Sequence, residues 1–243
     1  MNIIVEETYE AMSRVAADVI GRIVAAKPDC ILGLATGSTP IGLYAQLVDD
    51  YRQGKISFAD VTSFNLDEYR GLSGDHEQSY RYFMRQNLFD GVDIDQARTF
   101  VPDGSDPDAA HACDTYEALI ADAGGVDIQL LGIGHNGHIG FNEPADSFPV
   151  NTHVVQLTES TIQANSRLFD SIDEVPREAY TMGIGTIMKA HKILLVANGA
   201  DKAPAVRDAL FGPVVPTMPA SILQLHPDVT VVLDAEAASL CEL

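Results

Sequence analysis

Residues 30–47 read CILGLATGSTPIGLYAQL, and this stretch decides the predicted fold. It begins with an apolar run, as expected for a strand whose sheet is covered by helices on both faces. A small, hydroxyl-rich turn follows, and Pro40 then opens an amphipathic segment. Thr39 is the predicted N-cap, because threonine caps helices well and proline is favoured at the first helical position. Strand, tight turn and helix in this order are typical of an α/β sheet that binds ligands at the carboxyl ends of its strands.

The same alternation continues along the rest of the chain. Short apolar segments predict strands at residues 2–5, 30–35, 61–65, 99–101, 127–132, 153–157, 181–184, 192–197 and 230–233. Amphipathic segments predict helices at residues 9–26, 41–51, 78–89 and 107–123. No repeat or linker-like segment interrupts them. The sequence therefore predicts one α/β domain over residues 1–243, with a doubly wound, mostly parallel, Rossmann-like sheet and helices on both faces.

Composition and charge exclude several classes of function. Among 243 residues, 35 Asp and Glu face 15 Lys and Arg, which gives a net charge of −20. Such an excess argues against binding to nucleic acid and to anionic membranes, because both need basic side chains. A hydrophobic content of 46% excludes a disordered polyanion. Neither a secretory leader nor a membrane-spanning run of ~18 apolar residues is recognisable, so we expect a cytoplasmic protein.

The three cysteines, Cys30, Cys113 and Cys241, have no repeated spacing. The sequence therefore predicts neither a disulfide framework nor a cysteine-based metal site.

The turn that contains Gly37, Ser38 and Thr39 is a candidate anion site. Backbone N–H groups and the positive end of the helix dipole converge at the start of a helix. Gly37 allows close approach of the backbone, and the two hydroxyl groups are further donors. The motif GxxxxGK[ST] is missing, so the turn gives no support for a nucleoside triphosphate. Two interpretations stay open, an ordinary turn between strand and helix or a site for a small phosphate ester.

A second glycine-rich turn, GIGHNGHIGFNEP, occupies residues 132–144. It contains GxGxxG, but Pro144 prevents a long helix from following, and no acidic residue ends a second strand about 20 positions later. We interpret this match to the dinucleotide motif as a false positive. His138 and Glu143 form instead a candidate acid–base pair, because a carboxylate can fix the tautomer of a histidine. The alternatives are a purely structural loop and a metal site at His135 and His138, which the HxxH spacing supports poorly.

The segment FNLDEYRGL at residues 64–72 places two adjacent carboxylates after a predicted strand. Asp67 could serve as a general base there. A solvated acidic turn is the commoner outcome in so acidic a chain, and these residues alone do not decide between the two.

Taken together, these segments resemble the glucosamine-6-phosphate deaminases. The resemblance rests on TGSTP at 36–40, FNLDEYRGL at 64–72, Ser79-Tyr80, GIGHNGHIGFNEP at 132–144, ANSR at 164–167 and LQLHP at 223–227. These motifs span nearly the whole chain in the family's order. The resemblance implies an enzyme without cofactor or metal that isomerises and deaminates an amino-sugar phosphate, giving fructose 6-phosphate and ammonia.

The resemblance also implies roles for individual residues. Asp67 would move a proton between C2 and C1, and His138, paired with Glu143, would protonate the ring oxygen to open the sugar. The implied phosphate ligands are Gly37, Ser38, Thr39, Arg167 and Lys202. A lid at about residues 157–180 would carry Arg167 onto the phosphate.

The chain departs from some family members at two places. Asn136 stands where those members have aspartate, which makes the orientation of His138 less certain. His153 and Val155 stand where regulated hexamers have a basic pair. We therefore expect a monomer or a low-order homo-oligomer with hyperbolic kinetics, not activated by N-acetylglucosamine 6-phosphate. The alternatives are a 6-phosphogluconolactonase, a galactosamine-6-phosphate deaminase and, from another class, a sugar-phosphate-sensing domain without catalysis.

Overall fold

The computed structural model describes residues 1–158, 162–163, 169 and 171–242. Within these residues, the main sheet has seven strands, all paired in parallel. Their spatial order is β1 (Asn2–Glu6), β10 (Val229–Asp234), β9 (Lys192–Ala197), β6 (Ile128–Leu131), β2 (Ile31–Leu34), β3 (Thr62–Asn65) and β5 (Thr99–Phe100). The prediction of a parallel α/β sheet is confirmed.

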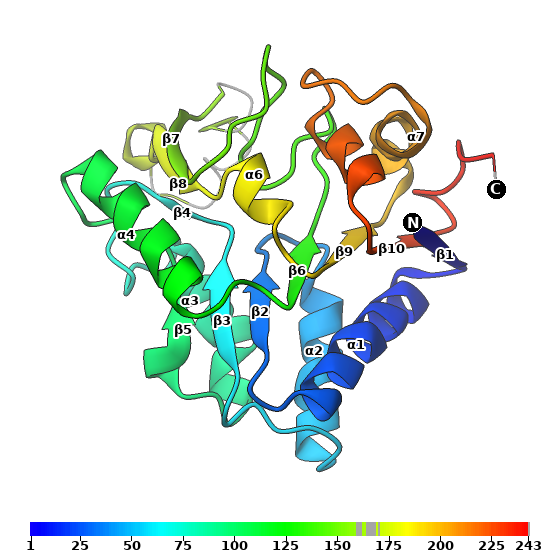
Figure 1. Cartoon of the computed structure of the whole chain (residues 1–243), viewed down its shortest axis with the longest axis horizontal. Coiled ribbons are helices and arrows are strands. Elements are labelled where there is room, and N and C mark those ends of the chain that lie inside the picture. The colour runs from blue at the N-terminus through cyan, green and yellow to red at the C-terminus, as the bar shows by residue number, and fades with distance from the viewer. Residues whose placement is uncertain (159–161, 164–168, 170, 243) are drawn as a thin grey trace.

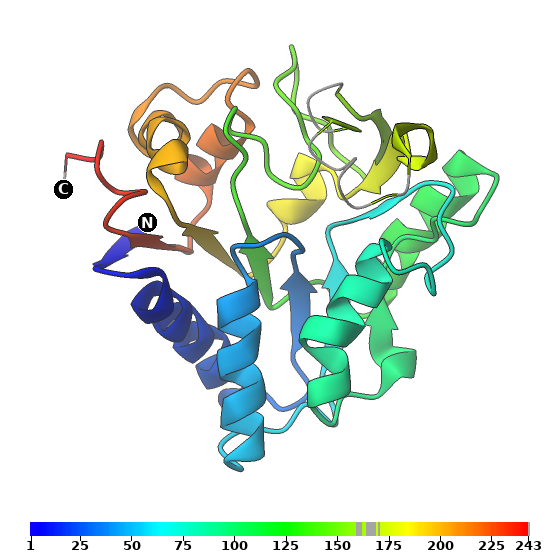
Figure 2. The ribbon, with the colours of Figure 1, turned by 180° about the vertical axis from the view of Figure 1, so that it is seen from behind.

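Helices cover both faces of this sheet. In the view of Figure 1, α4 lies in front of the strands, whereas α2 and α3 lie in front of them in the opposite view of Figure 2. The helices are α1 (Tyr9–Ala26), α2 (Ile41–Arg52), α3 (Tyr80–Asn87), α4 (Ala109–Asp122), α6 (Ile184–Ile187) and α7 (Ala203–Phe211). Short 3₁₀ turns are η1 (Phe89–Gly91), η2 (Gln96–Arg98), η4 (Ile172–Glu174), η5 (Ala200–Lys202) and η6 (Pro219–Leu225).

The core lies between the sheet and these helices. Every residue of β2 and β10 is buried, as are the last five residues of β9. Burial on consecutive positions is what two covered faces of a parallel sheet require. No helix in the described part of the chain is long and apolar enough to cross a lipid bilayer.

The strand order reverses between β2 and β6. From β2 the chain continues outward through β3 and β5, and it then returns to place β6, β9 and β10 on the other side. Open α/β sheets bind ligands in the crevice outside the carboxyl ends of the strands at such a reversal. The turns that follow β2 and β6 are the two glycine-containing turns singled out by the sequence.

A second, antiparallel sheet lies beyond the carboxyl ends of β2 and β3 (Figure 1). It consists of β4 (Asp67–Tyr69), β8 (Glu178–Thr181) and β7 (His153–Gln156). The strand predicted at 153–157 therefore exists but lies outside the main sheet. The strand predicted at 181–184 is wrong, because β8 ends at Thr181 and α6 begins at Ile184. A short apolar run is compatible with either structure, and periodicity alone does not separate them.

Candidate active site

A cavity of about 300 Å³ opens at the reversal of strand order. Its walls come from the turn after β2, the start of β4, the start of α3, the glycine-rich turn after β6 and η5 after β9. It brings together most of the predicted site residues, namely Gly37, Ser38, Thr39, Asp67, His138 and Lys202. Arg167 and the central part of the lid predicted at about 157–180 lie outside the described residues.

The turn after β2 offers unpaired backbone donors to this cavity. No described residue accepts a hydrogen bond from the N–H groups of Gly37, Ser38 or Thr39. Gly37 has a φ of 99°, in the region that favours glycine, and a side chain there would be strained. Several N–H groups that line one cavity at the start of a helix form an anion site.

The predicted N-cap at Thr39 is wrong. The Thr39 hydroxyl donates a hydrogen bond of 2.7 Å to Oδ1 of Asn198, which follows β9. Helix α2 begins at Ile41, and the Gly42 N–H donates to the Tyr9 hydroxyl at 2.8 Å. The hydroxyl therefore ties the turn after β2 to the turn after β9 instead of capping the helix.

Lys202 supplies positive charge on the β9 side of the cavity. Burial lowers the pKa of Lys202, while the neighbouring Asp201 opposes that shift. The carboxylate of Asp201 also accepts a hydrogen bond of 2.6 Å from Nε2 of His135. This contact joins the turn after β6 to η5, which carries Lys202.

Asp67 is buried at the start of β4, where it lines the cavity. Asp67 is 6% exposed, on the side of the strand that faces the cavity, and its neighbour Glu68 is 2% exposed. Burial, together with the negative charge of Glu68, raises the pKa of Asp67 to about 8. The alternative of a solvated acidic turn is therefore wrong. A carboxyl group that ionises this close to neutral pH is suited to exchanging protons with a ligand.

His138 faces the cavity and is backed by two polar side chains. Its Nδ1 lies 3.0 Å from Oε1 of Glu143, although the contact is not directed along a ring N–H bond. The Asn136 amide donates a hydrogen bond to Oε2 of Glu143, and its Oδ1 accepts one of 3.2 Å from the His138 backbone. Burial opposes the charge on Glu143, but the contacts with His138 and Asn136 outweigh it and keep the pKa of Glu143 low. Asn136 thus orients the carboxylate that faces His138.

Glycines of the GxGxxG match leave space for the His138 ring and allow the turn that carries it. A Cβ on Gly134 would lie 2.3 to 2.5 Å from three atoms of the His138 ring. Gly137 has a φ of 83°, and a Cβ there would lie 1.9 Å from Sδ of Met218. The motif therefore provides space and a turn for an imidazole, in agreement with its interpretation as a false dinucleotide signature.

Replacing Gly134 by alanine is expected to lower kcat/KM about 100-fold, the usual cost of displacing a reacting group by about 1 Å. The new methyl group would overlap the His138 ring and push it out of position. The matched control is Gly21→Ala in α1, outside the cavity, where a Cβ meets only Cδ1 of Ile56 at 4.0 Å. Steady-state kinetics of both variants check the prediction, and equal activities would contradict it.

Two further side chains complete the wall beside Asp67. Tyr80 and Phe141 both line the cavity, and their rings stack with centroids 6.1 Å apart. Tyr80 belongs to the Ser79-Tyr80 motif, for which the sequence predicted no role. In the structure Ser79 is the N-cap of α3 and Tyr80 is its first residue, whereas the helix was predicted from residue 78. The serine before Tyr80 is the signal that could have set this helix start and placed Tyr80 near the ligand.

Comparisons with known proteins agree with this geometry. The family model described as glucosamine-6-phosphate isomerases/6-phosphogluconolactonase matches residues 5–232. A glucosamine-6-phosphate deaminase of Lachnoclostridium phytofermentans is 56% identical over 232 residues, covering 96% of this chain and 98% of that protein. One of Clostridium perfringens is 52% identical over 240 residues, covering 99% of each.

Among solved structures, a deaminase and a lactonase match this chain to different degrees. A structure described as a monomeric glucosamine-6-phosphate deaminase matches with a TM-score of 0.95 and 50% identity, covering 99% of this chain and all of that one. A 6-phosphogluconolactonase from Trypanosoma brucei matches with a TM-score of 0.75 but only 23% identity, covering 99% and 98%. The second likeness shows a shared fold and nothing more specific.

Proposed function

Because the chain belongs to the family of glucosamine-6-phosphate isomerases and 6-phosphogluconolactonases, we propose that it converts glucosamine 6-phosphate and water to fructose 6-phosphate and ammonia. The relatives that share at least half of its residues carry the name of this deaminase. One observation carries the proposal. A single cavity holds a buried carboxyl group, a histidine backed by a carboxylate, and an amide-lined turn beside a lysine.

The phosphate group of the substrate would bind at the turn after β2. The backbone N–H groups of Gly37, Ser38 and Thr39 would donate to its oxygens, and Lys202 would neutralise charge. Arg167 is proposed as a further phosphate ligand on the basis of the family resemblance. Because the phosphate is remote from the reacting carbons, its binding energy can position them.

Ring opening would fall to His138. The imidazole would give a proton to the ring oxygen while the C1 hydroxyl loses its own proton to water, and Glu143, held by Asn136, would orient the His138 ring. The open-chain aldehyde then exposes its C2 hydrogen to a base.

Asp67 would carry out the isomerisation. Its carboxylate would remove the proton from C2 to form an enolamine and return the proton to C1, which leaves an imine at C2. Water adds to this imine and expels ammonia, so that the ketone of fructose 6-phosphate remains. Holding the carboxylate against C2 avoids the entropy of a bimolecular encounter.

We further propose that the protein acts as a monomer in the cytoplasm. The similar solved deaminase is described as monomeric. A phosphorylated sugar is charged and crosses a lipid bilayer poorly, and this supports a location of the enzyme in the compartment where its substrate is made. The pair His153 and Val155 lies on β7 and offers no permanent positive charge, in keeping with kinetics that an acetylated sugar phosphate does not alter.

Ammonia and fructose 6-phosphate release from glucosamine 6-phosphate tests the proposed function. Parallel assays use galactosamine 6-phosphate and 6-phosphogluconolactone, and one adds N-acetylglucosamine 6-phosphate as a candidate activator. We expect stoichiometric release of both products, a hyperbolic saturation curve and no activation. Lactone hydrolysis without ammonia release would replace the proposal by a lactonase.

Replacing Lys202 by methionine is expected to raise KM about 10- to 100-fold with a smaller change in kcat. A hydrogen bond to a charged group contributes about 1.5–3 kcal/mol, and methionine keeps the length of the side chain without its charge. Lys189→Met removes an exposed charge from the end of α6 and serves as the control. An unchanged KM in Lys202→Met would contradict the assignment of the phosphate end.

A further inference from the structure

Glu68 is a buried carboxylate to which the proposed chemistry gives no role. It follows Asp67 in β4, and successive side chains of a strand face opposite sides. Asp67 lines the substrate cavity, whereas Glu68 lines a second cavity of about 270 Å³. The two carboxylates are therefore neighbours in the chain that serve opposite faces of the same short strand.

Three backbone N–H groups hold the Glu68 carboxylate. Its Oε1 accepts hydrogen bonds from Tyr69 at 2.8 Å and Tyr80 at 2.9 Å, and its Oε2 accepts one from Arg81 at 3.0 Å. Tyr80 and Arg81 are the first residues of α3, whose N–H groups have no partner within the helix. The Ser79 hydroxyl accepts from the next free N–H group, that of Tyr82, at 3.1 Å. Glu68 is thus the anchor of this helix on β4.

Tyr80, the first residue of the anchored helix, also forms part of the wall of the substrate cavity. Tyr80 binds Glu68 through its backbone and lines the substrate cavity with its ring. That ring packs on Phe141, which lines the same cavity, and on Tyr69, with centroids 4.8 Å apart in the second pair. A shift at the start of α3 would therefore move an aromatic wall of the substrate cavity.

We propose that Glu68 is a positioning residue for the proposed deamination, which holds the first turn of α3 on β4 and so fixes Tyr80 and Asp67 around the substrate. Its charge is part of this role, since a carboxylate binds backbone N–H groups more strongly than a neutral acceptor does. The inference rests on the proposed function for its kinetic consequences, but the anchoring contact can be tested without any activity.

The charge of Glu68 also acts on the proposed base. Burial raises the pKa of Glu68 to about 7, although its three N–H donors favour the ionised form. Above that pH its negative charge disfavours a second charge on Asp67. Among the described residues, Arg81 favours the Glu68 carboxylate, and the phenols of Tyr80 and Tyr116, whose pKa values lie well above the usual value for tyrosine, also interact with this pair.

Two substitutions of Glu68 separate the effect of its contact with α3 from the effect of its negative charge. Glu68→Gln keeps the length and one carbonyl acceptor but loses the charge. Glu68→Asp keeps the charge but is too short to reach α3. Both are compared with Glu77→Gln, which removes an exposed carboxylate just before the same helix. The measurements are kcat/KM against pH, amide hydrogen exchange of the segment that contains Tyr80 and Arg81, and thermal unfolding to verify folding.

We expect Glu68→Asp to lower kcat/KM about 10- to 100-fold. Amide hydrogen exchange at Tyr80 and Arg81 should be faster, and the acid limb of the profile of kcat/KM against pH should stay at the wild-type pH. Glu68→Gln should lose less activity and move the acid limb to lower pH by about one unit, because a like charge beside Asp67 has been removed. Glu77→Gln should match the wild type in all three measurements.

Wild-type kinetics and exchange in Glu68→Asp would overturn the proposal, as would an unmoved acid limb in Glu68→Gln. Failure of the wild-type protein to release ammonia would refute the proposed function instead. In that case the exchange measurement still decides whether Glu68 anchors α3.

Discussion

Replacing Asp67 by asparagine is expected to lower kcat for ammonia release by about 100- to 10,000-fold, the usual contribution of a general base. Asparagine has nearly the shape of aspartate but cannot accept a proton from C2. The phosphate end of the cavity is unchanged in this variant, so the substrate should still bind. Steady-state kinetics give the fall in kcat, and calorimetric titration with the substrate gives its dissociation constant.

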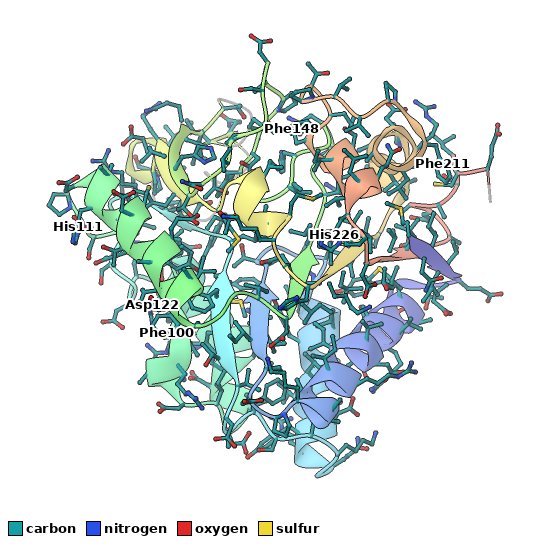
Figure 3. The ribbon with its side chains drawn as sticks, in the orientation of Figure 1. Phe100, His111, Asp122, Phe148, Phe211 and His226 are labelled. Carbon is teal, nitrogen blue, oxygen red and sulfur yellow. The ribbon has the colours of Figure 1, made fainter. Side chains whose placement is uncertain are left out.

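The pH dependence of the wild type belongs to the same prediction. Since the pKa of Asp67 is raised to about 8, kcat/KM should increase as the pH rises toward that value, because the base is then ionised in a larger fraction of the molecules. Asp122→Asn provides the control, because Asp122 is exposed at the end of α4, outside the cavity (Figure 3). Near wild-type turnover in Asp67→Asn, or a comparable loss in Asp122→Asn, would refute the assignment of the base.

Replacing His138 by glutamine should produce the second large effect, a fall in kcat of about 100-fold or more. Glutamine can donate a hydrogen bond to the ring oxygen but cannot deliver a proton to it. Because amino sugars also open slowly in water without a catalyst, some turnover should remain, and more than in Asp67→Asn. Initial rates of ammonia release measure both variants side by side.

His191→Gln is the matched control for this substitution. His191 is exposed at the start of the segment that leads into β9, and it takes no part in the cavity. Full activity of His138→Gln would show that ring opening is either not rate-limiting or not assisted by this side chain.

The parts of the fold that depend on local sequence were predicted well. The helix predicted at 9–26 and the strand predicted at 192–197 coincide with α1 and β9. Both have strong local signals: Thr8 accepts a hydrogen bond from the Ala11 N–H as the N-cap of α1, and β9 is a continuous apolar run. The order of the strands is a property of distant segments, and no local pattern could supply it.

The second sheet could not be predicted from local sequence, because its strands pair with segments that are distant in the chain. The strand predicted at 61–65 ended before Asp67 and Glu68, and the sequence left open whether they form a solvated acidic turn or supply a general base. Their extended conformation comes from pairing with β8, whose residues lie more than a hundred positions later in the chain. The burial of Asp67 follows from the same long-range contact. The turns after β2 and β6, by contrast, were predicted as site segments because their glycines and polar residues follow apolar strands directly.

The buried carboxyl group of Asp67 makes the fold less stable as the pH rises. The unfolded chain hydrates this charge and the folded chain does not, so stability falls between the ordinary pKa of 3.8 and the folded value of about 8. Asp67→Asn removes this cost and should unfold at a higher temperature than the wild type at alkaline pH. A variant library sorted for heat resistance alone would therefore enrich an inactive protein. Directed evolution of this chain needs selection for turnover and for thermal stability in the same round.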